Sequence, residues 1–117
     1  MHPTVLIVDD HKAFRESASA LLAVEGFAVV GTAADGAEAV AAAQRLRPQI
    51  VLLDIQLPDL DGFAVAELLN ATPRPPRIVL TSSRDFGQFA GRLQASGSPG
   101  FIAKRSLSGA ALAALVG

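Results

Sequence analysis

The sequence predicts an α/β fold, in which helices cover both faces of a doubly wound, five-stranded parallel sheet. Short apolar segments alternate with segments of helical periodicity along all 117 residues. The apolar segments are hydrophobic at successive positions, which is typical of parallel strands buried between two helical layers. Neither an internal repeat nor a long linker divides the chain, so residues 1–117 are expected to form one domain.

The first part of the chain is expected to fold as strand, helix, strand and helix. Val5–Val8 is too short for a helix and rich in β-branched residues, which favours a buried strand. Apolar residues at helical spacing then predict a helix from about His11 or Lys12 to Glu25, where a glycine ends it. Phe27–Ala33 is the second predicted strand, and the alanine-rich stretch Ala37–Leu46 is a helix that stops before a proline.

The middle of the chain continues this alternation. Ile50–Leu53 is an unbroken apolar run, and we expect it to be the third strand. Asp61 is a suitable N-cap for a helix over Gly62–Asn70. A stiff, proline-rich connector then leads to the fourth strand, Arg77–Thr81.

The last part of the chain adds two helices and a strand. Asp85–Ser96 is only weakly helical, because two glycines interrupt its apolar face and each costs about 1 kcal/mol relative to alanine. Phe101–Ala103 is the fifth predicted strand, and Leu107–Val116 is the last predicted helix.

Composition excludes several classes of protein. The formal net charge is −1, without the basic clusters of a nucleic-acid or membrane-surface protein. The absence of cysteine excludes disulfides and thiolate chemistry. No apolar run is long enough for a membrane span and no signal peptide is recognisable, so a cytoplasmic location is expected.

Four predicted strands end in polar residues suited to chemistry. Asp9 and Asp10 follow the first strand, Asp54 the third and Lys104 the fifth, while Thr81 ends the fourth. Because parallel strands end at one edge of the sheet, these side chains should meet there. Three neighbouring carboxylates repel one another unless a cation joins them, and Mg²⁺ prefers such oxygen ligands. A phosphorylated carboxylate would also have its charge compensated by this arrangement.

Each of these residues has a simpler interpretation when taken alone. An acid pair after a strand is often only a helix cap, and most lysines are solvated surface residues. The functional interpretation depends on their coincidence at corresponding strand ends. Other polar residues are interpreted as surface, loop or cap residues: His2, His11, Asp59 and Asp61.

Four segments contain these polar strand ends: VLIVDDH, VLLDIQLPDLDG, IVLTSS and GFIAK. With these segments in this order and spacing, the whole chain closely resembles the receiver domain of two-component response regulators. The resemblance implies a flavodoxin-like fold with five helices and the strand order 2-1-3-4-5. It also implies a signalling switch, rather than an enzyme, that promotes its own phosphorylation and dephosphorylation.

The resemblance implies a role for each residue of the site. Asp54 would accept a phosphoryl group from a histidine kinase. Asp10, Asp54 and the backbone carbonyl of Gln56 would bind Mg²⁺, with Asp9 acting mainly through water.

The same resemblance implies how the phosphoryl group is sensed. Lys104 would contact it, while Thr81 and Phe101 would switch position and so control a partner or an output domain. Gln56 and Ser83 match positions that modulate dephosphorylation.

Three features depart from the common family pattern. Arg105 stands where many members have proline, so the family's cis peptide after Lys104 would be a non-proline one. Phe101 replaces a frequent tyrosine and lacks its hydroxyl. The segment Asp85–Ser96 is expected to be loosely ordered and to form a mobile output face.

Other functions fit the sequence less well. A phosphatase with an aspartate nucleophile usually has a second acid two residues after it, but this chain has Gln56 there. A dinucleotide-binding module needs a glycine-rich first turn, but the first turn here is DDHKAF. The chain could instead be a receiver used only for constitutive protein binding.

The end of the chain, GFIAKRSLSGAALAALVG, is most similar to receivers that precede a helix-turn-helix DNA-binding domain. A role in transcription regulation is therefore expected, either within a longer regulator or as a stand-alone receiver. The resemblance leaves a homodimer open. We expect no direct nucleic-acid binding by this chain.

Overall fold

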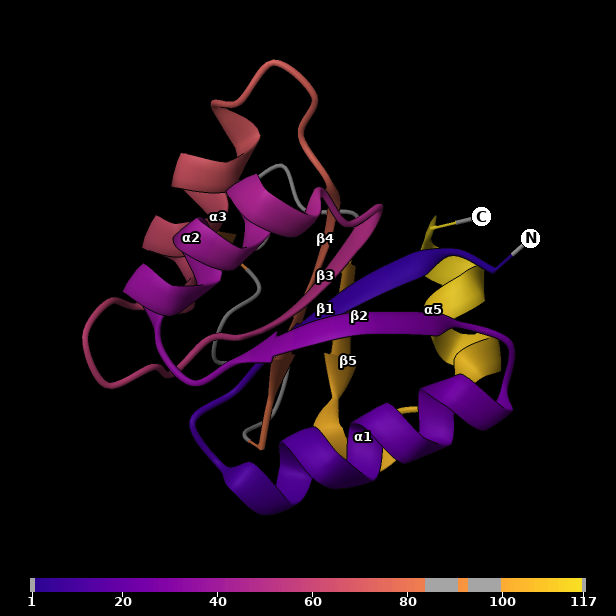
Figure 1. Cartoon of the computed structure of the whole chain (residues 1–117). Helices are drawn as coiled ribbons and strands as arrows, with labels where there is room; N and C mark the ends of the chain where they lie inside the picture. Colours follow the sequence, from indigo (N-terminus) through magenta and orange to yellow (C-terminus); the bar gives the residue numbers. More distant parts are fainter. Residues whose placement is uncertain (1, 84–90, 93–99, 117) are drawn as a thin grey trace.

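The structure is a computed structural model, and it describes residues 2–83, 91–92 and 100–116. From residue 4 to residue 82, strands alternate with helices (Figure 1). The strands are β1 (Thr4–Val8), β2 (Ala28–Ala33), β3 (Ile50–Asp54), β4 (Arg77–Ser82) and β5 (Gly100–Ala103). The described helices are α1 (Lys12–Val24), α2 (Gly36–Leu46), α3 (Gly62–Asn70) and α5 (Gly109–Val116).

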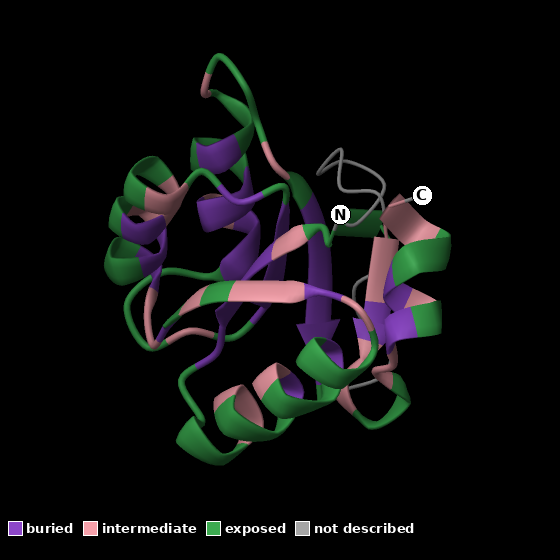
Figure 2. Ribbon diagram, turned by 45° about the vertical axis from the view of Figure 1, so that its right-hand side comes forward, coloured by how far each residue is buried: buried purple, intermediate pink, exposed green. Residues whose placement is uncertain are grey.

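The five strands form one parallel sheet in the order β2-β1-β3-β4-β5, which confirms the predicted fold class and strand order. Helices α2 and α3 cover one face of this sheet, and α1 and α5 cover the other (Figure 1). All five residues of the central strand β3 are buried, as its unbroken apolar run predicted. Buried residues concentrate in the sheet and on the inner faces of the helices (Figure 2).

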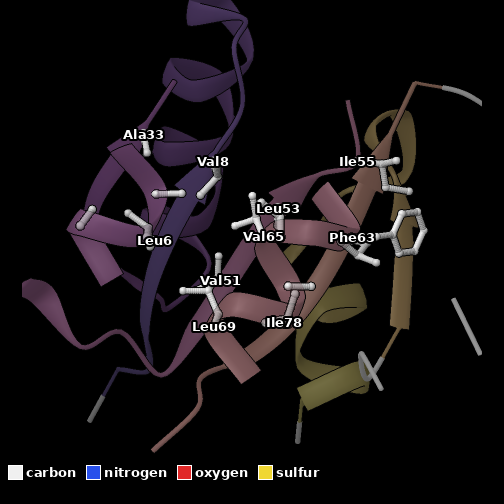
Figure 3. Close-up of a cluster of buried hydrophobic side chains, with 14 residues drawn as sticks. Leu6, Val8, Ala33, Val51, Leu53, Ile55, Phe63, Val65, Leu69 and Ile78 are labelled. Atoms are coloured by element: carbon white, nitrogen blue, oxygen red, sulfur yellow. The ribbon is translucent and has the colours of Figure 1, made fainter. Parts of the chain in front are cut away.

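Each face of the sheet has its own hydrophobic cluster. The cluster beneath α2 and α3 includes Leu53 of β3 and Val65 of α3 (Figure 3). The cluster beneath α1 and α5 includes Ala18, Leu22 and Leu112. Because both faces of β3 are buried, its register with the neighbouring strands is fixed, and so is the position of the residue at its end.

The helices differ from the prediction at the end of the chain. The predicted helix over Asp85–Ser96, with its proposed mobility, lies outside the described residues except for the helical pair at 91–92. The last helix begins at Gly109 rather than Leu107, because a 3-10 turn over Lys104–Ser106 comes first. The hydroxyl of Ser108 then accepts a hydrogen bond from the Ala111 N–H at 3.0 Å and caps the helix.

None of the helices in the described ranges has the length and apolar character needed to cross a bilayer.

Candidate functional site

The candidate site lies at the carboxyl-terminal edge of the sheet, around the ends of β1, β3, β4 and β5. Asp54 is the last residue of β3 and is 3% exposed. Asp9 directly follows β1 and is fully buried, whereas 37% of the Asp10 side chain is exposed. The strand register places Thr81 of β4 beside Asp54. The fold therefore brings these four residues to one rim, as the alternation of strands and helices suggested.

Lys104 brings a positive charge to the two buried carboxylates. It begins the 3-10 turn after β5, and only 14% of its side chain is exposed. Its Nζ lies 2.5 Å from Asp9 Oδ2 and 3.2 Å from Asp54 Oδ2. An unpaired buried charge is costly, so the loss of either the ammonium group or the carboxylates would leave the remaining charge uncompensated and destabilise the fold.

The site nevertheless retains an excess of negative charge. Burial raises the pKa of Asp54, and the charge of Asp9 raises it further, against the opposing effects of the Gln56 N–H and Lys104. Burial by itself would lower the pKa of Lys104, but its hydrogen bond to Asp9 and the charges of Asp54 and Asp9 outweigh burial and raise that pKa. One ammonium group thus serves two carboxylates, and a further cation would be favourable here.

His11 belongs to this site, although the sequence interpretation treated it only as a surface residue. Its backbone N–H donates to Asp9 Oδ1 at 2.8 Å. Its Nδ1 lies 3.0 Å from Asp9 Oδ1 and 3.1 Å from Asp10 Oδ1. The prediction of an exposed position is confirmed, since 68% of the side chain is accessible, but the ring also contacts both acids. The turn after β1 folds the ring back over both acids. By contrast, His2 is exposed and contacts the Gly26 carbonyl at 2.9 Å.

The acidic side chains are close enough together to hold a metal ion. Asp9, Asp10, His11 and Asp54 each offer a ligand atom, and these atoms all lie within 4.8 Å of one another. Carboxylate oxygens are the ligands that Mg²⁺ prefers, and the partly exposed Asp10 leaves room for the water molecules that Mg²⁺ usually keeps. The residues present therefore fit a magnesium ion.

Thr81 carries a buried polar group without a partner. The residue is 1% exposed, and its hydroxyl makes no hydrogen bond to any of the residues that the structure describes. A buried hydroxyl in this state costs free energy unless something else binds it. Phe101 lies one strand further along, on β5, where it is half-buried and packs against the cluster beneath α2 and α3.

Replacing Thr81 with valine should raise the free energy of unfolding by about 1 kcal/mol, because valine keeps the shape and removes the unsatisfied hydroxyl. Urea denaturation of the two proteins measures the difference. Thr72→Val is the matched control, since the Thr72 hydroxyl donates to the Leu69 carbonyl at 2.8 Å and its loss should destabilise the protein. Destabilisation by both substitutions to a similar extent would show that the Thr81 hydroxyl has a partner.

The start of α3 packs directly on the end of β3, and Gly62 makes this contact possible. Its N–H donates to the Ile55 carbonyl at 2.7 Å. A Cβ at this position would lie 2.4 Å from the Asp54 carbonyl oxygen and 2.7 Å from the Ile55 Cα. Gln56 and Asp61 also pair in a short antiparallel bridge. These two contacts join the beginning of the loop after Asp54 to its end.

Two acids of this loop have different structural roles. Asp61 caps α3 as predicted, since its Oδ1 accepts from the N–H groups of Phe63 at 2.8 Å and Ala64 at 3.1 Å. Asp59 instead caps a neighbouring helix: it accepts from the Gly36 N–H at 2.7 Å and the Ala37 N–H at 3.0 Å, at the start of α2. Asp59 therefore fixes the loop to α2.

Substituting Asp59 with asparagine should lower the thermal unfolding midpoint near neutral pH and have little effect in strong acid. The N–H groups of Gly36 and Ala37 lower the pKa of Asp59 below 3.8, so the fold favours its ionised form. This stability is complete above the ordinary pKa and is lost as the pH falls through the lower, folded value.

Unfolding midpoints of both proteins between about pH 7 and about pH 2 test this expectation. Glu67→Gln is the control, because among the described residues the exposed Glu67 carboxylate has no hydrogen bond or ion pair. A difference that grows toward acid would contradict the prediction.

The remaining predicted residues lie around the rim. Gln56 is exposed in the loop after β3, and its N–H donates to Asp54 Oδ1 at 3.0 Å. Ser83 is exposed just after β4. The described residues contain no cis peptide bond, and the Lys104–Arg105 bond is therefore trans.

Sequence reasoning missed two residues of α1 that contact the site. The ring of Phe14 lies beneath the Lys104 ammonium group, with 4.8 Å between Nζ and the ring centroid. Arg15 Nη1 donates to the Asp9 carbonyl oxygen at 2.8 Å. Phe14 is one of the apolar residues whose spacing predicted this helix, and nothing in the sequence indicated which strand end its ring would reach.

A large cavity elsewhere in the molecule is unrelated to this site. It lies toward the opposite edge of the sheet and is lined by residues that include Phe27, Arg47 and Arg77, but by none of the clustered acids.

The chain matches the response regulator receiver domain family over residues 5–116. Among curated relatives, it is 36% identical over 104 residues to the virulence-factor transcription regulator BvgA of Bordetella pertussis, and the match covers 89% of this chain and 50% of BvgA. The chain thus spans about half the length of such relatives.

Solved structures give the same result. The receiver domain of the Mycobacterium tuberculosis response regulator NarL has a TM-score of 0.87 at 30% identity, with 99% of this chain and 98% of that chain covered. A chain from the CheX–CheY–BeF3–Mg²⁺ complex of Borrelia burgdorferi has a TM-score of 0.83 at 30% identity, with 97% and 85% covered. The chain therefore belongs to the response regulator receiver domains of two-component systems.

Proposed function

We propose that this chain is a phosphorylation-controlled signalling switch in which Asp54 accepts a phosphoryl group from a histidine kinase. One observation carries the proposal: a buried carboxylate lies within 3.2 Å of a lysine ammonium group, beside an unsatisfied threonine hydroxyl, at the edge of a rigid sheet. The oxygens of a phosphoryl group on Asp54 would accept hydrogen bonds from both Lys104 and Thr81. A helix cap or a simple ion pair would not account for the unsatisfied threonine hydroxyl.

The acid cluster would hold Mg²⁺ in this reaction. We assign Asp10, Asp54 and the backbone carbonyl of Gln56 as direct ligands, and Asp9 as a ligand through water. When bound there, Mg²⁺ would supply positive charge next to the phosphoryl oxygens. The similar chain from Borrelia burgdorferi was solved in a complex that contains BeF3 and Mg²⁺, which supports a role for Mg²⁺ here.

The protein groups would act by position and charge. A carboxylate oxygen of Asp54 attacks the phosphorus of a phosphohistidine, a P–O bond forms, and the P–N bond breaks with its electron pair leaving on the imidazole nitrogen. The Lys104 ammonium group, which donates to Asp54 before the reaction, then donates to a phosphoryl oxygen instead. Because Asp54 is held rigidly by β3, little ordering is required before attack.

Phosphorylation would be sensed on the β4 and β5 side of the site. The Thr81 hydroxyl would donate to a phosphoryl oxygen, and Phe101 would follow this movement toward an output domain or partner protein. Gln56 and Ser83, both exposed at the rim, would tune hydrolysis by controlling the approach of water.

We infer that the output is transcription regulation in the cytoplasm, through a DNA-binding domain or a separate partner, with a homodimer as one route. The relatives named as transcriptional regulators support this inference. The alternative is a stand-alone or constitutively binding receiver without DNA-binding output.

Incubation with acetyl phosphate and Mg²⁺ tests the proposal. Intact mass spectrometry should show the addition of one phosphoryl group, and peptide mapping should place it on Asp54. Removal of Mg²⁺ by EDTA should prevent the addition. Labelling at another residue, or labelling that is unaffected by EDTA, would refute the assignment.

A further inference from the structure

We propose that Phe14 is a positioning residue for Lys104, and that the face of its ring keeps the ammonium group directed at Asp54 while that group changes hydrogen-bond partner. The proposal deepens the function proposed above and rests on it, since it requires Asp54 to be the phosphoryl acceptor.

The geometry around Lys104 is the first line of evidence. Nζ lies over the Phe14 ring, 4.8 Å from its centroid, which is within the range of a cation–π interaction. The carboxylates of Asp9 and Asp54 lie 2.5 and 3.2 Å from the same atom. Only 14% of the lysine side chain is exposed, so the ring and the two acids replace most of the water around the ammonium group.

The ring itself is held firmly. Phe14 lies in the first turn of α1 and packs against the cluster beneath α1 and α5. The same turn is tied to the acid pair, because Arg15 donates to the Asp9 carbonyl oxygen at 2.8 Å and the His11 N–H donates to Asp9 Oδ1 at 2.8 Å. The ring and the Asp9 carboxylate therefore have a fixed relative position.

An aromatic ring has a property that this step needs. It attracts a cation through its π face but offers no lone pair that competes for the ammonium protons. Lys104 can thus exchange Asp54 for a phosphoryl oxygen without leaving the ring. A leucine would fill similar space without attracting the charge, and a polar side chain would compete with the phosphoryl group.

The test compares Phe14→Leu with Phe14→Tyr, which retains the ring. Phe27→Leu is the matched control: Phe27 belongs to the same hydrophobic cluster, but among the described contacts no cation lies over its ring. Initial rates of Asp54 labelling are measured over a range of acetyl phosphate concentrations with saturating Mg²⁺, and thermal unfolding confirms that each variant is folded.

We expect Phe14→Leu to lower the labelling rate at saturating acetyl phosphate about fivefold, the kinetic equivalent of a typical cation–π interaction. The half-saturating acetyl phosphate concentration should not change. Phe14→Tyr should restore the rate to within about twofold of wild type, and Phe27→Leu should leave it unchanged. In a Lys104→Ala background, Phe14→Leu should have no further effect.

Equal losses in the leucine and tyrosine variants, or a fivefold loss that persists without Lys104, would overturn the proposal and leave Phe14 a packing residue. If Phe14→Leu does not fold, Phe14→Met replaces it, with the same expected loss. Failure of the wild-type protein to be labelled on Asp54 would instead refute the proposed function, which separates the two outcomes.

Discussion

Replacing Asp54 with asparagine should abolish phosphoryl transfer from acetyl phosphate, with labelling reduced to the background of the assay. The amide keeps nearly the same size and shape but is a poor nucleophile, and it removes one charged oxygen from the acid cluster. Intact mass spectrometry of wild-type and variant proteins, incubated in parallel with Mg²⁺, measures the result.

Asp59→Asn is the matched control for this loss. It makes the same chemical change five positions away, in a carboxylate that caps α2 rather than joining the acid cluster, and it should be labelled at close to the wild-type rate. Persistent labelling of the Asp54 variant would mean that another residue accepts the phosphoryl group. Equal loss in both variants would mean that loop order, rather than the Asp54 carboxylate, controls the reaction.

The asparagine variant should also remain folded, which makes the loss interpretable. Burial raises the pKa of Asp54, so the native state favours its neutral form, and ionisation at neutral pH costs stability. An uncharged amide avoids this cost. The thermal midpoint of the variant at pH 7 should therefore equal or exceed that of wild type, and the difference should shrink in acid.

Substituting Gly62 with alanine should lower the free energy of unfolding by about 3 kcal/mol, at the upper end of typical overpacking costs. The added Cβ would lie 2.4 Å from the Asp54 carbonyl oxygen, and the three atoms nearest to it all belong to the backbone of residues 54 and 55. No side-chain rotation can relieve this contact, so the start of α3 must move away from β3. Urea denaturation measures the loss, and labelling should slow because Asp54 itself is displaced.

Gly91→Ala is the control for Gly62, because a Cβ there lies within 4 Å of no atom of the described residues. This substitution should leave stability unchanged or raise it, as alanine favours helix over glycine. A small effect at Gly62, comparable with that at Gly91, would show that α3 does not pack as closely on β3 as described.

The sequence was sufficient to predict the fold and the rim because both follow from local patterns. Apolar runs identify strands, and parallel strands share an edge, so Asp9, Asp54 and Thr81 had to converge once the sheet was predicted. The N-cap role of Asp61 was equally local, since it involves residues two and three positions away.

Contacts that depend on the direction of a side chain could not be predicted in this way. Asp59 caps a helix 22 and 23 residues earlier in the chain, and Phe14 meets a lysine from the other end of the sequence. Both contacts depend on loop geometry and rotamers, which leave no periodic pattern. The position of His11 was missed for the same reason, because a tight turn places its ring on the acids.

The anchoring of the loop after Asp54 has a thermodynamic consequence for metal binding. Its Gln56–Asp61 bridge, the Gly62 hydrogen bond and the Asp59 cap hold the loop in place before any ligand arrives. A cation entering at Gln56 therefore loses little affinity to the entropy of ordering the chain. The affinity for the cation should instead depend mainly on the negative charge of the site. Added salt or the loss of one carboxylate should therefore weaken cation binding far more than a substitution that loosens the loop.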